Sequence, residues 1–217
     1  MDKLLNQLKQ HFSEKRLLSY EKIAQHKNLN ITEAVNLYKL NILLCEELYA
    51  FISCIEICLR NNIHKKMTVV FGKTNWYLDV DWGDKHKKQL EDAIKKVKKL
   101  THKDNIDPDT LISSISFGFW GHIFDGFYES TLWVKGLNKI FPYYQGSPNR
   151  KHIAAAFNTL LKVRNKIAHF ESIIKNEKQL LRTYNQMAEV INWISPEIYL
   201  WFKSFNNFDS LYKQLTA

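Results

Sequence analysis

Residues 33–66 read EAVNLYKLNILLCEELYAFISCIEICLRNNIHKK, a stretch in which apolar residues recur every three to four positions. The recurrence is clearest in its second half, at Leu48, Ile52, Ile55, Leu59 and Ile63. This spacing places those side chains on one face of an α-helix, and Thr32 is a residue type that caps helix N-termini. The sequence therefore predicts one long helix from Glu33 to about Lys66, with an apolar face along it.

Helix signals continue on both sides of this stretch. Five shorter helices are expected near residues 3–12, 15–26, 85–100, 151–169 and 177–194. Asp107-Pro108-Asp109 is typical of a helix start, with proline at the first position and an acid in the first turn, and Pro196 starts a last helix. All seven glycines lie between Gly72 and Gly146, which predicts an irregular centre between two helical flanks. The expected fold class is all-α, a helical bundle that forms a single domain over residues 1–217.

Composition excludes several classes and favours an anionic partner. Hydrophobic residues make up 45% and charged residues 24%, which excludes a wholly disordered chain. Only 7 Gly and 4 Pro argue against an all-β fold with many tight turns. The net charge of +9 favours nucleic acid ahead of a membrane surface as the partner. Most of this charge is local, because eight lysines stand against two acids between Lys85 and Lys103.

The start of the chain and the cysteines indicate a location. Met1-Asp2-Lys3-Leu4 lacks a basic segment followed by an apolar run, so no secretory signal is expected. A membrane span needs about 20 nearly uncharged residues, and the most apolar stretch is interrupted by charges. Cys45, Cys54 and Cys58 fall within one predicted helix, where we expect buried, reduced thiols. The expected location is the cytoplasm, without membrane contact.

Familiar cofactor and metal patterns are incomplete in this chain. Gly72-Lys73-Thr74 resembles the end of a phosphate-binding loop, but Met67 stands where that motif requires glycine. Asp79-Val80-Asp81 lacks the later acid of a calcium loop, whose place is taken by Leu90. The cysteines and histidines form no zinc pattern. We expect no metal and no cofactor.

The segment that carries chemistry is LLKVRNKIAHFE, residues 160–171. At about 100° per residue, Arg164 falls near the centre of the apolar arc of its helix, where a guanidinium needs a carboxylate, a carbonyl or a phosphate. Asn165 and His169, four residues apart, share a neighbouring face. A cation, an orienting amide and a titratable imidazole thus gather within one and a half turns. An ion-paired helix end with a surface histidine remains the alternative interpretation.

A second polar stripe lies on the long helix. Glu56, Arg60 and His64 are spaced by four residues along the edge of its apolar arc, and Asn61 lies beside them. The stripe is a candidate supporting set, because its acid could hold Arg164 or its arginine could supply a second cation. The alternative is a partly exposed salt bridge that contributes little to stability.

These residues carry a resemblance to known proteins. Arg164-Asn165-x-x-x-His169 resembles the Arg-x(4–6)-His motif of the HEPN superfamily of helical ribonucleases. The wider pattern resembles the Abi-like family of bacterial abortive-infection, or phage-defence, proteins. Its blocks are Ile55-Glu56-x-x-Leu59-Arg60-Asn61-x-Ile63, Ser116-Phe117-Gly118-Phe119-Trp120 and the segment 164–169. One position departs from the pattern, since relatives often carry a second histidine where this chain has Phe170.

The resemblance implies a HEPN-like helical bundle with additional N- and C-terminal helices, usually a homodimer, that cleaves RNA without a metal as a toxin or defence effector. The ribose 2′-OH would attack the adjacent phosphate and leave 2′,3′-cyclic phosphate and 5′-OH ends. His169 would be the general base or acid, because an imidazole exchanges protons near neutral pH. Arg164 would hold the phosphate in a bidentate manner, and Asn165 would orient the phosphate or the imidazole.

RNA is the expected partner, as substrate or as a regulatory RNA. The candidate phosphate contacts are Lys95, Lys96, Lys98, Lys99 and Lys166. A solvated helix face is the alternative for the lysines before residue 100, and the aromatic stretch 117–133 is expected to fill the core. A non-catalytic RNA-binding protein and a helical interaction protein without a nucleic-acid role are the alternative functions. The sequence leaves open whether an antitoxin, protein or RNA, restrains the chain.

Overall fold

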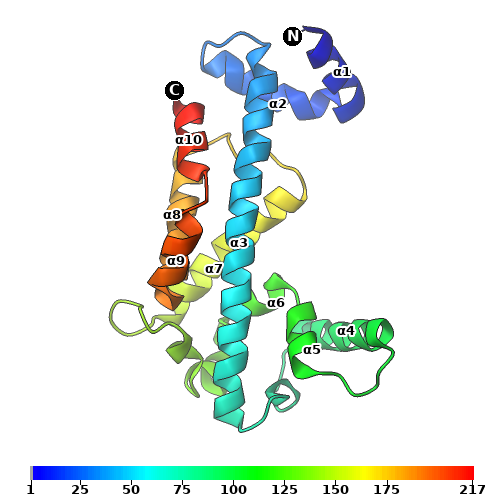
Figure 1. Cartoon of the computed structure of the whole chain (residues 1–217), viewed down its shortest axis with the longest axis vertical. Helices are drawn as coiled ribbons and strands as arrows, with labels where there is room; N and C mark the ends of the chain where they lie inside the picture. Colours follow the sequence, from blue (N-terminus) through cyan, green and yellow to red (C-terminus); the bar gives the residue numbers. More distant parts are fainter. Residues whose placement is uncertain (1) are drawn as a thin grey trace. The chain divides into compact units, whose positions relative to one another are not determined.

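The computed structural model describes residues 2–217, and every regular element in that range is a helix (Figure 1). The α-helices are α1 (Asp2–Phe12), α2 (Glu14–His26), α3 (Glu33–Phe71), α4 (Asp84–Thr101), α5 (Pro108–Ser114), α6 (Phe117–His122), α7 (Arg150–Ala168), α8 (Glu177–Ile194), α9 (Pro196–Lys203) and α10 (Phe208–Thr216). Short 3-10 turns at Trp76–Leu78, Gly126–Tyr128 and Leu137–Ile140 and a π-helical turn at Glu129–Trp133 complete the centre of the chain. The predicted all-α class is confirmed. None of the helices in residues 2–217 has the length and apolar character that crossing a bilayer requires.

The described chain forms two compact units, each made of separate stretches. Unit 1 contains residues 2–51, 163–185 and 205–217, and unit 2 contains residues 52–162 and 186–204. The helices α3, α7 and α8 each contribute residues to both units. The single domain over residues 1–217 stays a prediction.

Helix α3 begins at Glu33 as predicted but ends five residues later than predicted, at Phe71. All five residues of its predicted apolar face are buried, namely Leu48, Ile52, Ile55, Leu59 and Ile63. Met67 continues that buried face by one more turn, and Gly72, with φ +69°, ends the helix in the left-handed conformation that glycine favours. At the N-terminus, the side-chain oxygen of Asn30 accepts the Thr32 N–H at 3.1 Å, so Asn30 organises this turn in place of the predicted Thr32 cap.

In unit 1, α1 and α2 are joined by an ion pair whose carboxylate is buried. Glu21 of α2 is buried, and its carboxylate lies 2.7 Å from the Lys9 ammonium of α1. The ring of Tyr20 meets that of Tyr38 edge-on at 5.0 Å, which attaches α2 to α3. The charge of the buried Glu21 is therefore offset by Lys9.

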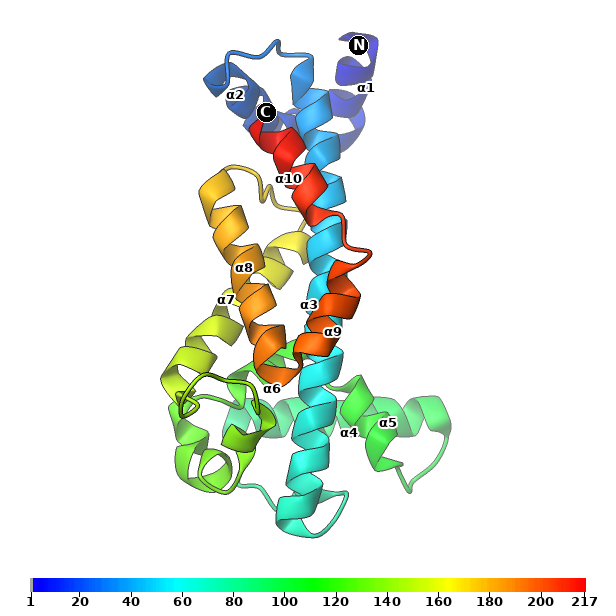
Figure 2. The same ribbon diagram turned by 60° about the vertical axis from the view of Figure 1, so that its left-hand side comes forward.

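The C-terminal segment forms two helices where the sequence predicts one last helix from Pro196. Helix α9 begins at Pro196 behind the N-cap Ser195, whose hydroxyl accepts the Ile198 N–H at 3.3 Å. A turn then allows α10 to pack in unit 1, where the Phe208 ring stacks on that of Tyr184 at 3.9 Å. Figure 2 shows α10 beside the first half of α3, where the Glu47 carboxylate accepts the Asn207 N–H at 3.0 Å. This carboxylate binds the turn between α9 and α10, and this tertiary contact has no local sequence signal.

The aromatic stretch 117–133 fills the core of unit 2, as predicted. Its buried aromatic residues are Phe117, Phe119, Trp120, Phe124, Tyr128 and Trp133. Phe127 is the exception, because 59% of it is exposed. The thiols of Cys45, Cys54 and Cys58 are free, but they are half-buried where burial was predicted.

A buried histidine sits at the centre of this aromatic core. His86 of α4 donates its Nε2 proton to the Phe119 carbonyl at 3.2 Å, since a carbonyl oxygen can only accept. Its Nδ1 then accepts the Tyr128 hydroxyl proton at 2.8 Å, and the Tyr128 oxygen accepts the Gly83 N–H at 3.2 Å. The network is complete only when the imidazole is neutral. Burial accordingly lowers the pKa of His86.

We expect the free energy of unfolding to decrease as the pH falls from 7.5 to 5.5. The unfolded imidazole takes up a proton near about pH 6.5, whereas the folded His86, with its lowered pKa, resists protonation. This difference in pKa stabilises the folded state above about pH 6.5. The stabilisation is lost as the pH falls through the lowered pKa of folded His86. The window lies above the ordinary carboxyl pKa values of about 4. Urea unfolding at several pH values measures the slope.

The matched variant is His86→Gln, whose amide can donate to the Phe119 carbonyl and accept from Tyr128 without titrating. It should flatten the pH dependence. His64, whose pKa burial also lowers, retains its own share of the slope in that variant. An unchanged slope in a folded His86→Gln protein contradicts the role given to His86.

Candidate active site

The candidate site lies at the C-terminal end of α7, which spans Arg150–Ala168 against a predicted helix at 151–169. The buried face of this helix ends at Leu161, and no residue from Lys162 to Phe170 is buried. Arg164 is therefore only half-buried, and its predicted place in the middle of a buried arc is wrong. The last two turns of α7 carry the motif residues on a largely open surface.

The three motif residues lie on the last turns of α7, within unit 1. Arg164 Nη1 donates to the Asn165 side-chain oxygen at 3.4 Å, and the Asn165 backbone carbonyl accepts the His169 N–H at 2.9 Å. Asn165 and His169 are exposed, as is the neighbouring Lys166. A guanidinium, an amide held by it and an imidazole thus lie on consecutive turns, with the imidazole accessible from outside.

Helix α7 ends in a tight left-handed turn directly after His169. Phe170 has φ +57°, its N–H is bonded to the Ile167 carbonyl at 3.0 Å, and the Glu171 N–H is bonded to the Lys166 carbonyl at 2.9 Å. This is the Schellman pattern, in which glycine is the usual residue at the left-handed position. A side chain there costs about 1 kcal/mol. The turn fixes the position of His169 as the last residue before the chain reverses.

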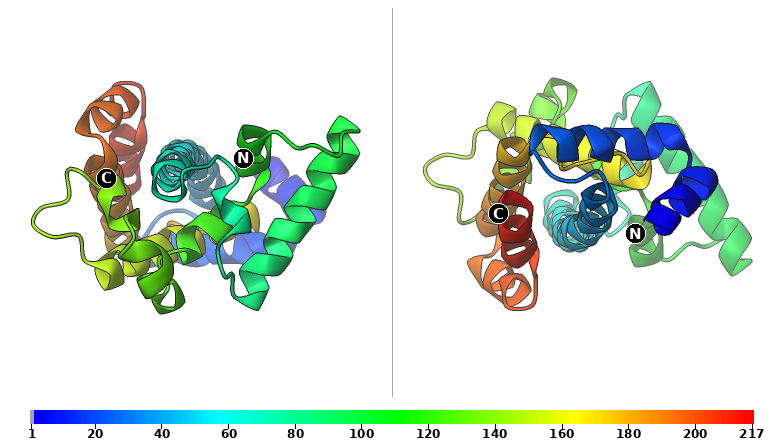
Figure 3. Two further views of the ribbon diagram at one scale, coloured as in Figure 1. Left: turned by 90° about the horizontal axis from the view of Figure 1, so that it is seen from below. Right: turned by 90° about the horizontal axis from the view of Figure 1, so that it is seen from above.

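Arg16 of α2 holds this turn from outside. Its Nη1 donates to the Phe170 carbonyl at 3.0 Å, and its guanidinium carbon lies 5.9 Å from the centre of the Phe170 ring. Figure 3 (right) shows α2 lying across the end of α7 in unit 1. The N-terminal part of the chain therefore takes part in shaping the surroundings of His169.

A groove of about 320 Å³ opens beside His169. It is lined by Ser13, Lys15, Arg16, Ser19, Tyr20, His169, Phe170, Glu171, Ser172 and Lys175. Three cations, Lys15, Arg16 and Lys175, outnumber the single acid, so the groove suits an anion. Burial raises the pKa of Tyr20 to about 12, so its phenol stays protonated at neutral pH and cannot act as a base. His169 supplies the imidazole in the lining of this groove, and histidine is the residue type that most often transfers protons in catalysis.

The groove residues of α2 and the residue that anchors the turn after His169 were not predicted from the sequence. The amide oxygen of the buried Asn41 accepts the Ile173 N–H at 2.9 Å and so ties this segment to α3. The role of Asn41 could have been recognised in the sequence, because this polar residue interrupts the apolar face between Leu37 and Leu44. No sequence pattern identifies Arg16 and Lys175 as groove residues, since their proximity to His169 arises only from tertiary packing.

The predicted supporting set lies in unit 2, whereas the motif residues lie in unit 1. Arg60 Nη1 donates to the Ser113 carbonyl at 3.1 Å. His64 Nδ1 accepts the indole N–H of Trp76 at 3.0 Å, and its Nε2 lies 3.4 Å from an Asp109 carboxylate oxygen. Glu56 is half-buried and Asn61 is exposed. These contacts stabilise the packing of unit 2, and a supporting role in catalysis stays a prediction.

The predicted basic helix 85–100 is α4, Asp84–Thr101. One face of α4 is buried through His86, Leu90, Ala93 and Val97. The candidate RNA contacts Lys95, Lys96, Lys98 and Lys99 are all exposed on the other side. Lys98 lies 3.3 Å from a carboxylate oxygen of Asp104. The surface is therefore available to an anionic polymer.

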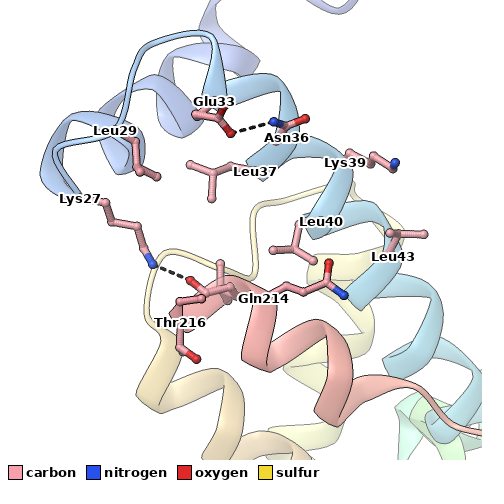
Figure 4. Close-up of a pocket in the computed structure, with 12 residues that line it drawn as sticks. Lys27, Leu29, Glu33, Asn36, Leu37, Lys39, Leu40, Leu43, Gln214 and Thr216 are labelled. Carbon is pink, nitrogen blue, oxygen red and sulfur yellow. Dashed lines mark hydrogen bonds between the residues drawn. The ribbon is translucent and has the colours of Figure 1, made fainter.

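A larger hollow of about 550 Å³ lies elsewhere in unit 1, between α3 and the end of α10 (Figure 4). Leucines 37, 40 and 43 of α3 form its apolar side. The Lys27 ammonium there is neutralised by Glu177 at 2.7 Å and also donates to the Leu215 carbonyl. Its lining contains no imidazole or thiol. Within residues 2–217, no three His, Cys, Asp or Glu side chains are grouped so that they could hold a metal ion.

Comparison with known proteins supplies the family. No curated protein and no solved structure gives a significant match to this chain. A family model described as Abi-like protein matches residues 3–175, which is most of the chain and includes α1 to α7 and the groove beside His169. The chain belongs to the Abi-like protein family.

Proposed function

We propose that this chain is a metal-independent endoribonuclease of the HEPN type that acts as a toxin in bacterial abortive infection, in the cytoplasm. Membership of the Abi-like family suggests the abortive-infection role. The observation that carries the enzymatic part is the Arg164–Asn165–His169 sequence at the end of α7, where the exposed His169 lines a groove with three cations. RNA is the substrate that fits both the net charge of +9 and this chemistry.

The reaction proposed is an internal phosphoryl transfer. An imidazole takes the proton of the ribose 2′-OH as its oxygen bonds to the adjacent phosphorus, and the bond from phosphorus to the 5′-oxygen breaks. The leaving oxygen takes up a proton, which gives 2′,3′-cyclic phosphate and 5′-OH ends. Arg164 stabilises the charge on the non-bridging oxygens, and Asn165 keeps the guanidinium oriented through the contact at 3.4 Å. DNA lacks the attacking hydroxyl and is not a substrate.

The reaction needs both a base and an acid, and one motif supplies a single imidazole. We propose that a second copy of the chain brings its own motif, so that one His169 accepts the proton and the other donates one. The open surface from Lys162 to Phe170 supports this arrangement, because it leaves room for a partner of the same kind.

Mapping of cleavage ends tests the proposal. Total bacterial RNA is incubated with the purified full-length protein in EDTA, and the new ends are sequenced by methods specific for 2′,3′-cyclic phosphate and 5′-OH. A model oligoribonucleotide and its 2′-O-methyl analogue form the matched pair, of which only the first should be cut. Cleavage of the analogue, cleavage abolished by EDTA, or 5′-phosphate ends would contradict the mechanism.

A second prediction concerns α4. Replacing Lys95, Lys96, Lys98 and Lys99 by Gln should weaken binding to a 2′-O-methyl RNA strand about tenfold or more at 0.1 M salt. Each lost phosphate contact lowers the slope of log affinity against log salt by about 0.7 for a single strand. Fluorescence anisotropy at four salt concentrations measures both effects.

The matched control removes the same charge from exposed lysines outside α4, at Lys3, Lys65, Lys139 and Lys178. If both quadruple variants bind RNA equally, the α4 surface has no special role. Tight binding of RNA that depends on the α4 lysines, without any RNA cleavage, would instead favour a non-catalytic RNA-binding protein.

A further inference from the structure

The groove beside His169 continues along α2. An adjoining hollow of about 410 Å³ shares Lys15, Ser19 and Lys175 with it and adds Lys22 and His26. Lys15, Ser19, Lys22 and His26 recur at the spacing of one helical face. Together the two hollows form a basic path, which we call the α2 path, with His169 at one end.

The charge of the α2 path is greater than the sequence of α2 suggests. Lys15, Arg16 and Lys22 are partly offset in sequence by Glu14 and Glu21. The carboxylate of Glu21 is buried against Lys9, so it does not weaken the field in the groove. Lys175 adds a cation from the segment after α7. The α2 path is thus suited to a chain of phosphates.

Phe170 stands at the end of this path and is poorly explained by folding alone. Its backbone occupies the left-handed region, where a bulky side chain is strained. Its ring gains little from burial, because 71% of the residue is exposed. A bulky aromatic ring held at a strained, exposed position points to a contact made outside the folded chain.

The contact that fits this ring is a nucleobase. An exposed aromatic ring stacks readily on an unpaired base, whereas bases within a duplex already stack on each other. The Arg16 guanidinium fixes one side of the Phe170 turn, and phosphate-binding cations lie close by in the groove. The volume of about 320 Å³ lies at the small-ligand end of pocket sizes, which suits one nucleotide.

We infer that the groove is a nucleotide subsite for single-stranded RNA next to the bond that is cut. The base stacks on Phe170 while Lys15 and Lys175 bind the flanking phosphates and guide the strand along the α2 path. As a cleavage subsite, this role rests on the proposed function of the chain. The binding itself can be tested without cleavage.

The test ligand is a fluorescent 2′-O-methyl uridine dodecamer, which lacks the attacking hydroxyl. It is compared with a strand of the same length and backbone without bases, and with a duplex of the same length. Wild-type protein should bind the base-bearing single strand about fivefold or more tightly than the strand without bases. It should also prefer that strand to the duplex.

Phe170→Gly removes the ring and places the favoured residue at the left-handed position. This variant should lose the preference for bases while its Tm stays the same or rises, a combination that a purely structural role for Phe170 does not produce. Phe170→Asn, the next best residue for this conformation, serves as a second variant. Phe170→Tyr should retain the preference. The double variant Lys15→Gln/Lys175→Gln should weaken binding of the base-bearing strand and of the strand without bases equally.

Tyr143→Ala is the control, since Tyr143 is 53% exposed but belongs to unit 2 and does not line the groove. Unchanged base preference in folded Phe170→Gly and Phe170→Asn proteins would overturn the subsite. Equal wild-type binding of the strand without bases, or of the duplex, would overturn it as well. A base preference that depends on Phe170 in a protein that cuts no RNA would support the subsite and refute only the nuclease. Cleavage without that preference would refute only the subsite.

Discussion

RNA cleavage by the His169→Ala protein is expected to be slower than wild-type cleavage by at least about a hundredfold, because a positioned general acid or base contributes about 10²–10⁴ to a rate. The substitution should leave the fold intact. The His169 side chain is exposed, and the bond that ties this residue to α7 runs from its backbone N–H to the Asn165 carbonyl at 2.9 Å. Exposed substitutions of this kind change stability by about 0.5 kcal/mol or less. Initial cleavage rates and the Tm, measured on the same samples, test both statements.

His11→Ala is the matched control, because it removes another exposed imidazole of unit 1 that does not line the groove. Cleavage should be retained in this variant. The experiment also tests the expectation of two cooperating copies. If the base and the acid come from different chains, mixing wild type with an excess of His169→Ala protein should suppress cleavage. Full activity of a folded His169→Ala protein would remove His169 from the mechanism.

Most of the helices and the motif could be predicted because their signals are local, whereas α6 and the separate helix α10 were not predicted. The starts of α5 and α9 follow from the capping residue and the proline at the boundary, as when Asp107 accepts the Thr110 N–H at 2.9 Å ahead of Pro108. The end of α3 was predicted near Lys66, but Met67 continues the buried face and Gly72 ends the helix.

The surroundings of the motif could not be predicted, because they depend on which helices meet. Arg16 and Phe170 are 154 positions apart, yet a hydrogen bond of 3.0 Å joins them. The left-handed turn at Phe170 was also hidden, since glycine usually marks such a position and this chain has an aromatic residue there. In the same way, the burial of Glu21 made the surface of α2 more basic than its sequence. Sequence periodicity identifies the face that carries the chemistry, and tertiary packing determines what lies opposite it.

Replacing Arg164 by Lys should slow RNA cleavage by about 10²–10³-fold although the positive charge is kept. That range is typical for the loss of one donor that stabilises charge in a transition state. The guanidinium can bind Asn165 through Nη1, as it does at 3.4 Å, and still direct other N–H groups at two phosphate oxygens. A lysine ammonium has no such planar fork and cannot perform both tasks in this geometry.

The same substitution separates binding from catalysis. A lysine at position 164 still attracts phosphate, so the salt dependence of RNA binding and the KM should stay close to wild type while kcat falls. Arg182→Lys, at an exposed position of α8 that does not line the groove, is the matched control and should leave both parameters unchanged. If Arg164→Lys retains full kcat, charge alone is sufficient at this position and the bidentate role is wrong. If KM rises while kcat is unchanged, Arg164 binds substrate and transition state equally, and stabilisation of the transition state must come from other residues.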